Sequence, residues 1–164
     1  MTNSSLPCLR STALTTILLV LFTFGMTIQS SATASKPGIP KPSCRIEVDD
    51  AHISSSMQKH LKVDVLKVNA RSICNVRQDR VTLTLIIYKI GFFSDHFIHS
   101  SETNPLTPSS SGLIVKIQDA KVACKNNQPS SYYGIAYAKA FINGKWQYAG
   151  KTRSANIRNL RCGT

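Results

Sequence analysis

The sequence predicts an all-β domain, an antiparallel β-sandwich with two disulfides, and three observations support that prediction. Several segments alternate apolar and polar residues with a period of two, which is typical of half-buried strands. Turn residues separate these segments at short intervals, as they do in sandwiches. An even number of cysteines follows the N-terminal segment, and in an exported chain an even number indicates disulfides. These cysteines are Cys44, Cys74, Cys124 and Cys162.

Residues 1–34 have the pattern of a secretory signal peptide. Arg10 is the only charged residue in this segment, and the mostly apolar run 13–28 follows it. Ala32 and Ala34 then form an A-x-A cleavage site. An uncleaved membrane anchor is the alternative, but a spanning helix needs about 20 apolar residues and this run is shorter. Cleavage and secretion, to the extracellular space or the cell envelope, are therefore predicted.

Cleavage after Ala34 would start the mature chain at Ser35 and would remove Cys8. Residues 35–43 hold three prolines and a glycine, so an extended, flexible leader is expected there. Residues 44–164 are long enough for one hydrophobic core and are expected to form a single domain. No second long apolar stretch follows, so no transmembrane span is expected after processing.

The first two strands are expected over residues 60–70 and 81–91. The alternation within residues 60–70 changes phase, which indicates a bulge or a switch between sheets. A polar turn around residues 54–58 precedes this strand, and no helix is expected in the domain. Residues 81–91 become apolar on both faces, so this strand should be central. Its most regular apolar face consists of Val81, Leu83, Leu85 and Ile87.

Two further strands are expected in the middle of the chain. The alternation in residues 113–117 predicts one of them, and residues 96–102 would add a short edge strand. Residues 104–112 are rich in serine and proline and are expected to form a loop.

A β-hairpin is expected near the C-terminus. Residues 132–143 and 145–149 are two strand-like runs around Asn143-Gly144. Asn-Gly between two such runs is the strongest short-range signal for a two-residue type I′ turn. A two-residue loop places Phe141 opposite Trp146, which would form a favourable cross-strand aromatic pair.

The hairpin geometry favours local disulfide pairing, although four cysteines allow three pairings. Cys124 and Cys162 lie almost symmetrically about the Asn143-Gly144 turn, so both arms return to a similar place. Cys44 and Cys74 belong to segments that one polar turn joins. The expected bonds are therefore Cys44–Cys74 and Cys124–Cys162. A structural zinc site is the rival interpretation, and no C-x-x-C or paired-histidine spacing supports it.

The C-terminal segment carries a Tyr-Gly-x-Ala-x-Ala motif before its tight turn. The motif and its surroundings comprise Cys124, Tyr132-Tyr133-Gly134, Ala136, Tyr137, Ala138, Asn143-Gly144-Lys145 and Cys162-Gly163. This set resembles small secreted proteins of actinobacteria, which are similar to immunoglobulin-like sandwiches and are uncharacterised in function. The resemblance implies an immunoglobulin-like antiparallel β-sandwich in a secreted protein, and it transfers no active-site residue. Unlike the antibody pattern, Cys124 precedes the motif strand and Trp146 follows it.

The chain is strongly basic, with 20 Lys and Arg against 8 Asp and Glu. Such a field favours anionic partners outside the cell, namely wall polymers, polysaccharides or lipid headgroups. Nucleic acid is less favoured because no recognised module is present. A charge that serves only solubility is the alternative interpretation. The candidate contacts for an anionic partner are Lys139, Lys145, Lys151, Arg153, Arg158 and Arg161.

No catalytic, metal or cofactor site is predicted. The nearest approaches are two polar clusters, Asp95, His96, His99 and Glu102 in one and Asp49, Asp50 and His52 in the other. The two histidines of the first cluster would point to opposite faces of a strand, because their spacing is odd. No activated serine or cysteine motif accompanies the second cluster.

A group of apolar residues lies beside the long central connection, namely Phe92, Phe93, Phe97 and Ile98. They are expected to cover the open end of the sandwich, and an exposed patch that docks a partner is the alternative. The predicted function is a secreted, basic, non-catalytic binding module for an anionic partner. A secreted antagonist, either toxin-like or an enzyme inhibitor that uses loop 104–112, is the first alternative. A secreted hydrolase is the second.

Overall fold

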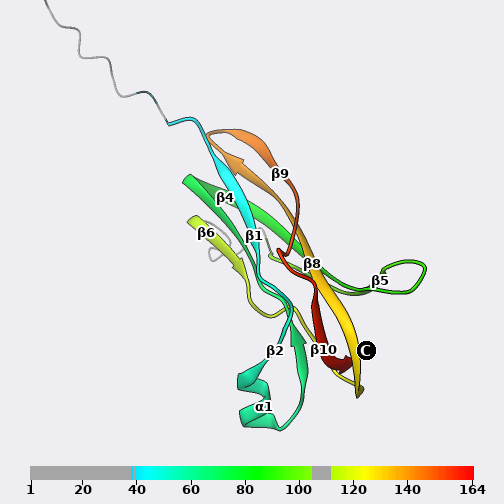
Figure 1. Cartoon of the computed structure of the whole chain (residues 1–164). Helices are drawn as coiled ribbons and strands as arrows, with labels where there is room; N and C mark the ends of the chain where they lie inside the picture. The colour runs from blue at the N-terminus through cyan, green and yellow to red at the C-terminus, as the bar shows by residue number, and fades with distance from the viewer. Residues whose placement is uncertain (1–37, 39, 105–111) are drawn as a thin grey trace, which may run out of the picture. The chain divides into compact units, whose positions relative to one another are not determined.

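The computed structural model describes residue 38, residues 40–104 and residues 112–164, so the predicted signal peptide lies outside it. Residues Gly38–Thr164 form one compact unit. Figure 1 shows its elements, which are β1 (Cys44–Val48), β2 (His52–Ile53), α1 (Ser55–Leu61), β3 (Val65–Lys67), β4 (Ala70–Lys89), β5 (His96–Glu102), β6 (Gly112–Ile117), β7 (Lys121–Ala123), β8 (Asn126–Ile142), β9 (Lys145–Arg153) and β10 (Arg158–Gly163).

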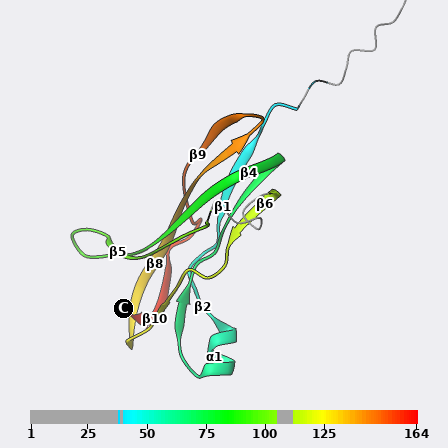
Figure 2. The ribbon, with the colours of Figure 1, turned by 180° about the vertical axis from the view of Figure 1, so that it is seen from behind.

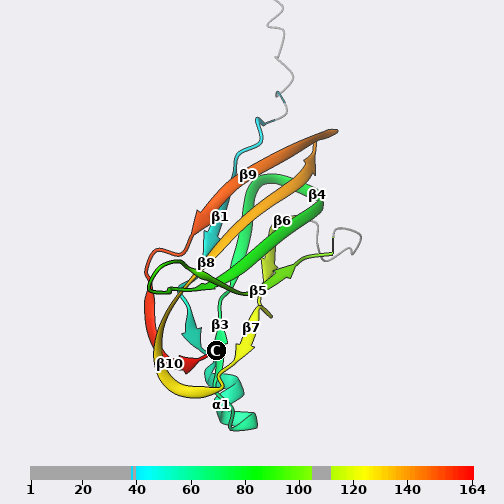
Figure 3. The ribbon, with the colours of Figure 1, turned by 90° about the vertical axis from the view of Figure 1, so that its right-hand side faces the viewer.

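Two antiparallel layers make up the domain, and the long strand β4 belongs to both. The first half of β4 pairs with β1 and β6, and its second half pairs with β5 and β8. β8 also pairs with β9 and β10, which completes the second layer. A small third sheet, in the order β2-β3-β7, lies beside α1 at one end of the unit (Figure 3). The predicted class, an all-β antiparallel sandwich with two disulfides, is confirmed.

β4 changes layers through a bend that begins after Ile73, where its pairing with β6 shifts register, and ends near Arg80. The register of its pairing with β8 shifts between Asp79 and Thr82. Arg80 has a φ of 45°, a left-handed value that residues other than glycine rarely adopt. Ser72 Oγ donates to Gln78 Oε1 at 2.8 Å, whereas six residues of straight strand would span about 20 Å. The strand therefore folds back on itself, as Figure 3 shows, in the way that bulged strands turn corners between packed sheets.

The inner faces of the two layers share one hydrophobic core. Gly134 of β8 packs tightly against this core. A Cβ added there would lie 2.7 Å from Val68 Cγ1 and 3.0 Å from Val48 Cγ1. The glycine of the Tyr-Gly-x-Ala-x-Ala motif is thus required by packing. The predicted apolar face of β4 is fully buried, at Val81, Leu83, Leu85 and Ile87.

Both predicted disulfides are confirmed. Cys44–Cys74 joins residues that lie directly opposite each other in β1 and β4. Cys124–Cys162 joins the residue after β7 to β10, and so closes the segment that contains β8 and β9. Each disulfide therefore joins one segment to a later strand that lies beside it in the fold.

The predicted C-terminal hairpin is also confirmed. Asn143 and Gly144 have φ values of 49° and 77°, and positive φ at both central residues defines a type I′ turn. Phe141 lies opposite Trp146, with ring centroids 5.5 Å apart. Strands β5 and β6 match the two strands expected in the middle of the chain.

The expectation that no helix is present is wrong, and so is the early start of the first long strand. Ser55–Leu61 forms α1, and only Val65–Lys67 of the expected strand forms β3. Leu61 and Val63 are 59% and 45% exposed, so the alternation there marks no buried face. The chain does switch sheets within this segment, because β3 pairs in the small sheet and β4 in the first layer, but the switch follows Lys67, whereas the phase change between Val65 and Leu66 lies inside the regularly paired β3.

The end of the predicted leader contacts the first layer. The Asn75 side-chain Nδ2 donates to the Lys41 carbonyl at 3.1 Å, and its Oδ1 accepts a bond from the Ser43 backbone N–H at 2.8 Å. Residues 41–43 are consequently held against β4 by a single asparagine.

Candidate functional site

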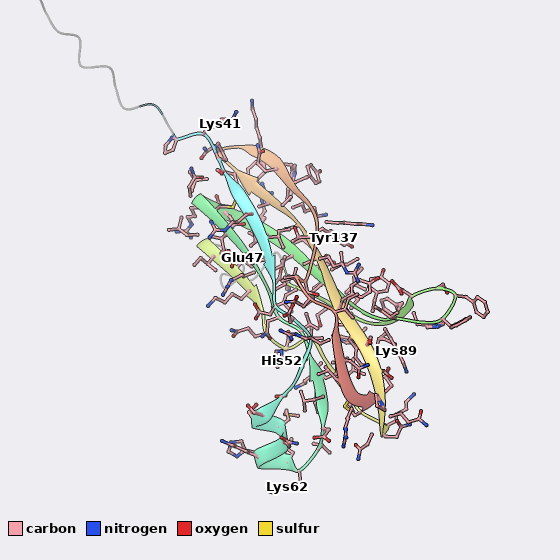
Figure 4. All side chains as sticks on the ribbon, viewed as in Figure 1. Lys41, Glu47, His52, Lys62, Lys89 and Tyr137 are labelled. Carbon is pink, nitrogen blue, oxygen red and sulfur yellow. A yellow bond between two sulfur atoms is a disulfide. The ribbon has the colours of Figure 1, made fainter. Side chains whose placement is uncertain are left out.

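The outer face of the second layer gathers aromatic, cationic and hydroxyl side chains from β4, β5, β8 and β9. The ladder aligns them in rows across the sheet, so their order follows from register alone. The rows are Phe141–Trp146, then Thr82–Lys139–Tyr148, then Glu102–Thr84–Tyr137. We call these residues, together with Arg80, the aromatic–cation surface. Figure 4 marks Tyr137 on β8, and from Tyr137 to Phe141 the strand rises about 13 Å.

Two cations lie on the aromatic rings at one end of this surface. The Arg80 guanidinium carbon is 4.1 Å from the Phe141 ring centroid and 5.6 Å from that of Trp146. Lys139 Nζ is 5.9 Å from the Trp146 centroid. A guanidinium that stacks through its flat face keeps its in-plane N–H donors for a bidentate bond to an anion. Arg80 makes these contacts from a left-handed backbone conformation, which costs on the order of 1 kcal/mol.

A groove lies beside these cations, with a volume of about 340 Å³, near the lower end of the range for ligand pockets. Thr82 and Thr84 form its floor, and Tyr137 and Tyr148, 37% and 77% exposed, line it. Thr84 Oγ1 donates to Glu102 Oε2 at 3.0 Å, which fixes the carboxylate at one side. The groove therefore offers aromatic faces, hydroxyls, a carboxylate and an ammonium group together.

A second hollow, of about 290 Å³, lies between the layers and shares Tyr148 with the groove. Its buried polar side chains, Ser72 and Gln78, satisfy each other, and Gln78 Nε2 also donates to the Leu113 carbonyl at 3.1 Å. Since its polar groups are already engaged, this hollow presents less for a ligand to recognise than the outer groove does.

Most cations of the described residues have no acidic partner. Ion pairs there involve only Arg45, Arg71, Arg77 and Arg158, all with carboxylates within 4.0 Å. Glu47 accepts bonds from Arg45 and Arg71, and these bonds hold the pKa of its carboxyl below its usual value. Arg80 and the three lysines of the β8–β9 hairpin, Lys139, Lys145 and Lys151, are not in these ion pairs.

The structure separates the six basic residues that the sequence grouped. Lys139 belongs to the aromatic–cation surface, whereas the others spread along β9, β10 and the hairpin end. Lys145 pairs with Ile142 and Arg161 with Pro129, positions about 40 Å apart along β8. The remaining three are Lys151, exposed on β9, Arg153, whose guanidinium carbon is 3.8 Å from the Tyr133 ring centroid, and Arg158, which is bound to Asp50.

The polar cluster around Asp50 fastens two loops together. The Asp50 carboxylate accepts bonds from the Asn156 backbone and side chain, both at 2.9 Å, and from the Arg158 guanidinium at 2.8 Å. The Asn156 bonds, followed by Arg158, hold the pKa of Asp50 below its usual value. Asp49 accepts a bond from Asn69, and His52 bonds to the Asp50 carbonyl. These groups are occupied by structural contacts.

The residues of the polar cluster around Asp95 do not come together in one site. Asp95 accepts a bond from Tyr133 Oη at 2.6 Å, and His99 Nε2 lies 3.1 Å from Ser101 Oγ. Burial, followed by the bond to Asp95, raises the pKa of Tyr133 to about 12. His96 is exposed in the ladder opposite Lys89. Within the described ranges no three potential metal ligands gather.

The four apolar residues of the central connection are mostly in water. Phe92 and Phe93 are 93% and 95% exposed and Phe97 is 61% exposed, so these three do not cover the sandwich end. Ile98 alone packs partly against the core. They belong to a β4–β5 hairpin that reaches out from the rest of the unit in both opposite views (Figures 1 and 2).

Comparison with family models, with curated proteins and with solved structures finds no match to this chain. The resemblance to small secreted proteins of actinobacteria therefore stays a prediction. Two disulfides fit an oxidising, non-cytoplasmic compartment. Among the residues that the structure describes, no helix is both long and apolar enough to cross a membrane.

Proposed function

We propose that this chain is a secreted, non-catalytic binding module that holds an anionic extracellular polysaccharide on the aromatic–cation surface. The observation that carries the proposal is the position of Arg80, whose guanidinium carbon lies 4.1 Å from the Phe141 ring centroid and which shares the Trp146 ring with Lys139, a residue that lines a groove of mixed polarity. Acidic groups of the polymer would bond to Arg80 and Lys139. Sugar rings would lie on Tyr137 and Tyr148.

The groove chemistry favours a glycan over a uniformly charged polymer. Glu102 lies in the groove, where it would repel a phosphate backbone but would accept bonds from sugar hydroxyls. The hydroxyls of Thr82, Thr84 and the two tyrosines add further donors and acceptors. Nucleic acid thus remains the less favoured partner.

The alternative functions have weaker support. The loop through which an antagonist would act, residues 104–112, lies mostly outside the described residues. A hydrolase needs a free acid–base pair near a groove, whereas Asp49, Asp50 and Asp95 are engaged in structural bonds.

Retention and affinity on heparin, against neutral dextran, test the proposal. Changing Arg80 and Lys139 to glutamine should weaken heparin binding at least about tenfold and flatten its salt dependence, because two charge-assisted contacts are lost. Changing Tyr137 and Tyr148 to alanine should weaken binding while leaving the salt slope unchanged.

The matched control is the double change Lys116→Gln and Lys121→Gln, which removes the same charge from two exposed positions on β6 and β7. This control should keep nearly wild-type affinity. If the Arg80/Lys139 variant behaves like the control, the charge acts only through the net field and the proposed site is wrong. Equal retention of all variants on dextran and heparin would also reject it.

A further inference from the structure

The tip of the β4–β5 hairpin presents two phenylalanines side by side to solvent. Phe92 and Phe93 are 93% and 95% exposed, and their ring centroids are 4.8 Å apart with the planes at 87°. Large apolar side chains exposed singly are ordinary, but an adjacent pair on a projecting turn forms a continuous apolar patch. Each exposed ring would gain free energy if it moved from water into an apolar environment.

The base of the hairpin is held in place by several contacts. Tyr133 Oη donates to Asp95 Oδ2 at 2.6 Å, and the rings of Tyr88 and Tyr133 stack with centroids 5.4 Å apart. The Ile90 backbone N–H donates to the Ser131 carbonyl at 2.8 Å. A side chain at Gly91 would meet the Ser94 carbonyl oxygen at 2.2 Å, so the turn closes tightly. The two rings are therefore presented by an anchored element, which lowers the entropy cost of docking.

Cations and amphipathic aromatics surround this base. Lys89 lies at the end of β4, where Figure 4 labels it, opposite His96 and Tyr132. Arg153 stacks on the Tyr133 ring, with its guanidinium carbon 3.8 Å from the centroid. Apolar rings at a tip, with cations at the base of the same hairpin, form the arrangement that suits a bilayer interface with anionic headgroups.

We propose that the Phe92–Phe93 tip inserts into the surface of an anionic phospholipid bilayer, while Lys89 and Arg153 bind its headgroups. Charge complementarity selects this occupant, because the chain carries 20 basic and 8 acidic residues. Two phenylalanine rings give only weak partitioning into a bilayer, so stable binding also requires the attraction between the basic side chains and the anionic headgroups. This inference is independent of the proposed polysaccharide site, since Thr82 of the groove lies about 23 Å along β4 from Lys89.

The experiment is co-sedimentation of the purified, disulfide-bonded protein with vesicles of phosphatidylcholine, alone or with a third of phosphatidylglycerol. We expect binding only to the anionic vesicles and a decline as salt rises. The variant F92S/F93S should lose at least about tenfold in partition for each ring removed. The control L61S/V63S removes two exposed apolar residues near α1, 59% and 45% exposed, and should bind like wild type.

A fluorescent substitution checks insertion directly. In F93W, emission should shift to the blue and be quenched by lipids that carry a quencher within the bilayer, whereas wild-type Trp146 should not respond. Absence of binding to anionic vesicles at low salt would overturn the inference, as would equal binding by F92S/F93S. A concentration-dependent dimer that this variant abolishes, without vesicle binding, would assign the tip to a second copy instead. Unchanged heparin retention by F92S/F93S separates this result from the polysaccharide site.

Discussion

Gly134→Ala should test how closely the two layers are fitted. The new Cβ would lie 2.7 Å from Val68 Cγ1, 3.0 Å from Val48 Cγ1 and 3.4 Å from Leu85 Cδ1. Carbon atoms prefer separations of about 3.5–4.0 Å, so Val68 must retreat by about 1 Å. Val68 and Leu85 are fully buried and have little space to move into. Such overpacking costs about 1–3 kcal/mol out of a total stability of about 5–15 kcal/mol.

Urea unfolding measures this cost and a second substitution identifies its cause. Val68→Ala alone should lose about 2–3 kcal/mol, because it removes buried methyl groups and leaves a cavity. In the double variant the alanine at position 134 fills part of that cavity. The two losses should therefore sum to more than the loss of the double variant, with a coupling of about 1–2 kcal/mol.

Gly150→Ala is the matched control, because Gly150 lies on the neighbouring strand β9 and has no atom within 4 Å of an added Cβ. It should be neutral or stabilise by up to about 1 kcal/mol, since alanine reduces the freedom of the unfolded chain. A loss of stability in Gly134→Ala no greater than in Gly150→Ala would refute the packing argument. Additive losses in the double variant, within about 0.5 kcal/mol, would refute the assigned contact.

Three further predictions concern the covalent and ionic framework. Removing Cys124–Cys162 should cost about 4 kcal/mol and removing Cys44–Cys74 slightly less, because their loops span 38 and 30 residues; urea unfolding of the paired Cys→Ala variants measures both, and equal stability to wild type would contradict the expectation. Asp50→Asn should destabilise at pH 7. Because the folded pKa of Asp50 is lowered, its contribution is present above the ordinary value of 3.8 and is lost as the pH falls through the folded pKa; a stability difference that stays constant from pH 7 to pH 3 would exclude this linkage. Exported protein should begin at Ser35 on N-terminal sequencing, and recovery only in membranes would argue for an anchor.

The parts of the fold that the sequence predicted correctly are those where local geometry sets the register. The Asn143-Gly144 turn fixes which residues of β8 and β9 oppose each other, so Phe141 and Trp146 could be paired before the structure was known. The same symmetry brought Cys124 to Cys162. α1 escaped detection because its seven residues include none that is buried and no side-chain cap bond marks its start.

The aromatic–cation surface was only partly predictable, because a local turn sets the register of β8 with β9 but not that of β4 with β8. β4 pairs with β8 across a long stretch of sequence, and a bulge at the bend shifts the register between Asp79 and Thr82. Sequence patterning cannot supply that register, so nothing indicated that Arg80 would lie on Phe141. Phe92 and Phe93 were assigned to the sandwich end because the open end of a sandwich needs apolar cover, whereas they lie on a hairpin that projects outward and are 93% and 95% exposed.

The two proposed sites are joined by one strand, and this connection has a mechanical consequence. Thr82 of the groove and Lys89 at the base of the tip both belong to the second half of β4, which is paired on both sides by β5 and β8. A strand that is hydrogen-bonded to a neighbour on each side is rigid and offers no hinge. A tip inserted in the bilayer would therefore hold the groove at a fixed distance of roughly 20–30 Å from the lipid surface. A polymer confined to that layer would meet the groove at a raised effective concentration, and binding to membrane and polymer together would exceed either affinity. Mixed vesicles that display a tethered anionic glycan should therefore be retained more strongly than the separate affinities predict, and either F92S/F93S or the double Arg80/Lys139 change should abolish that excess.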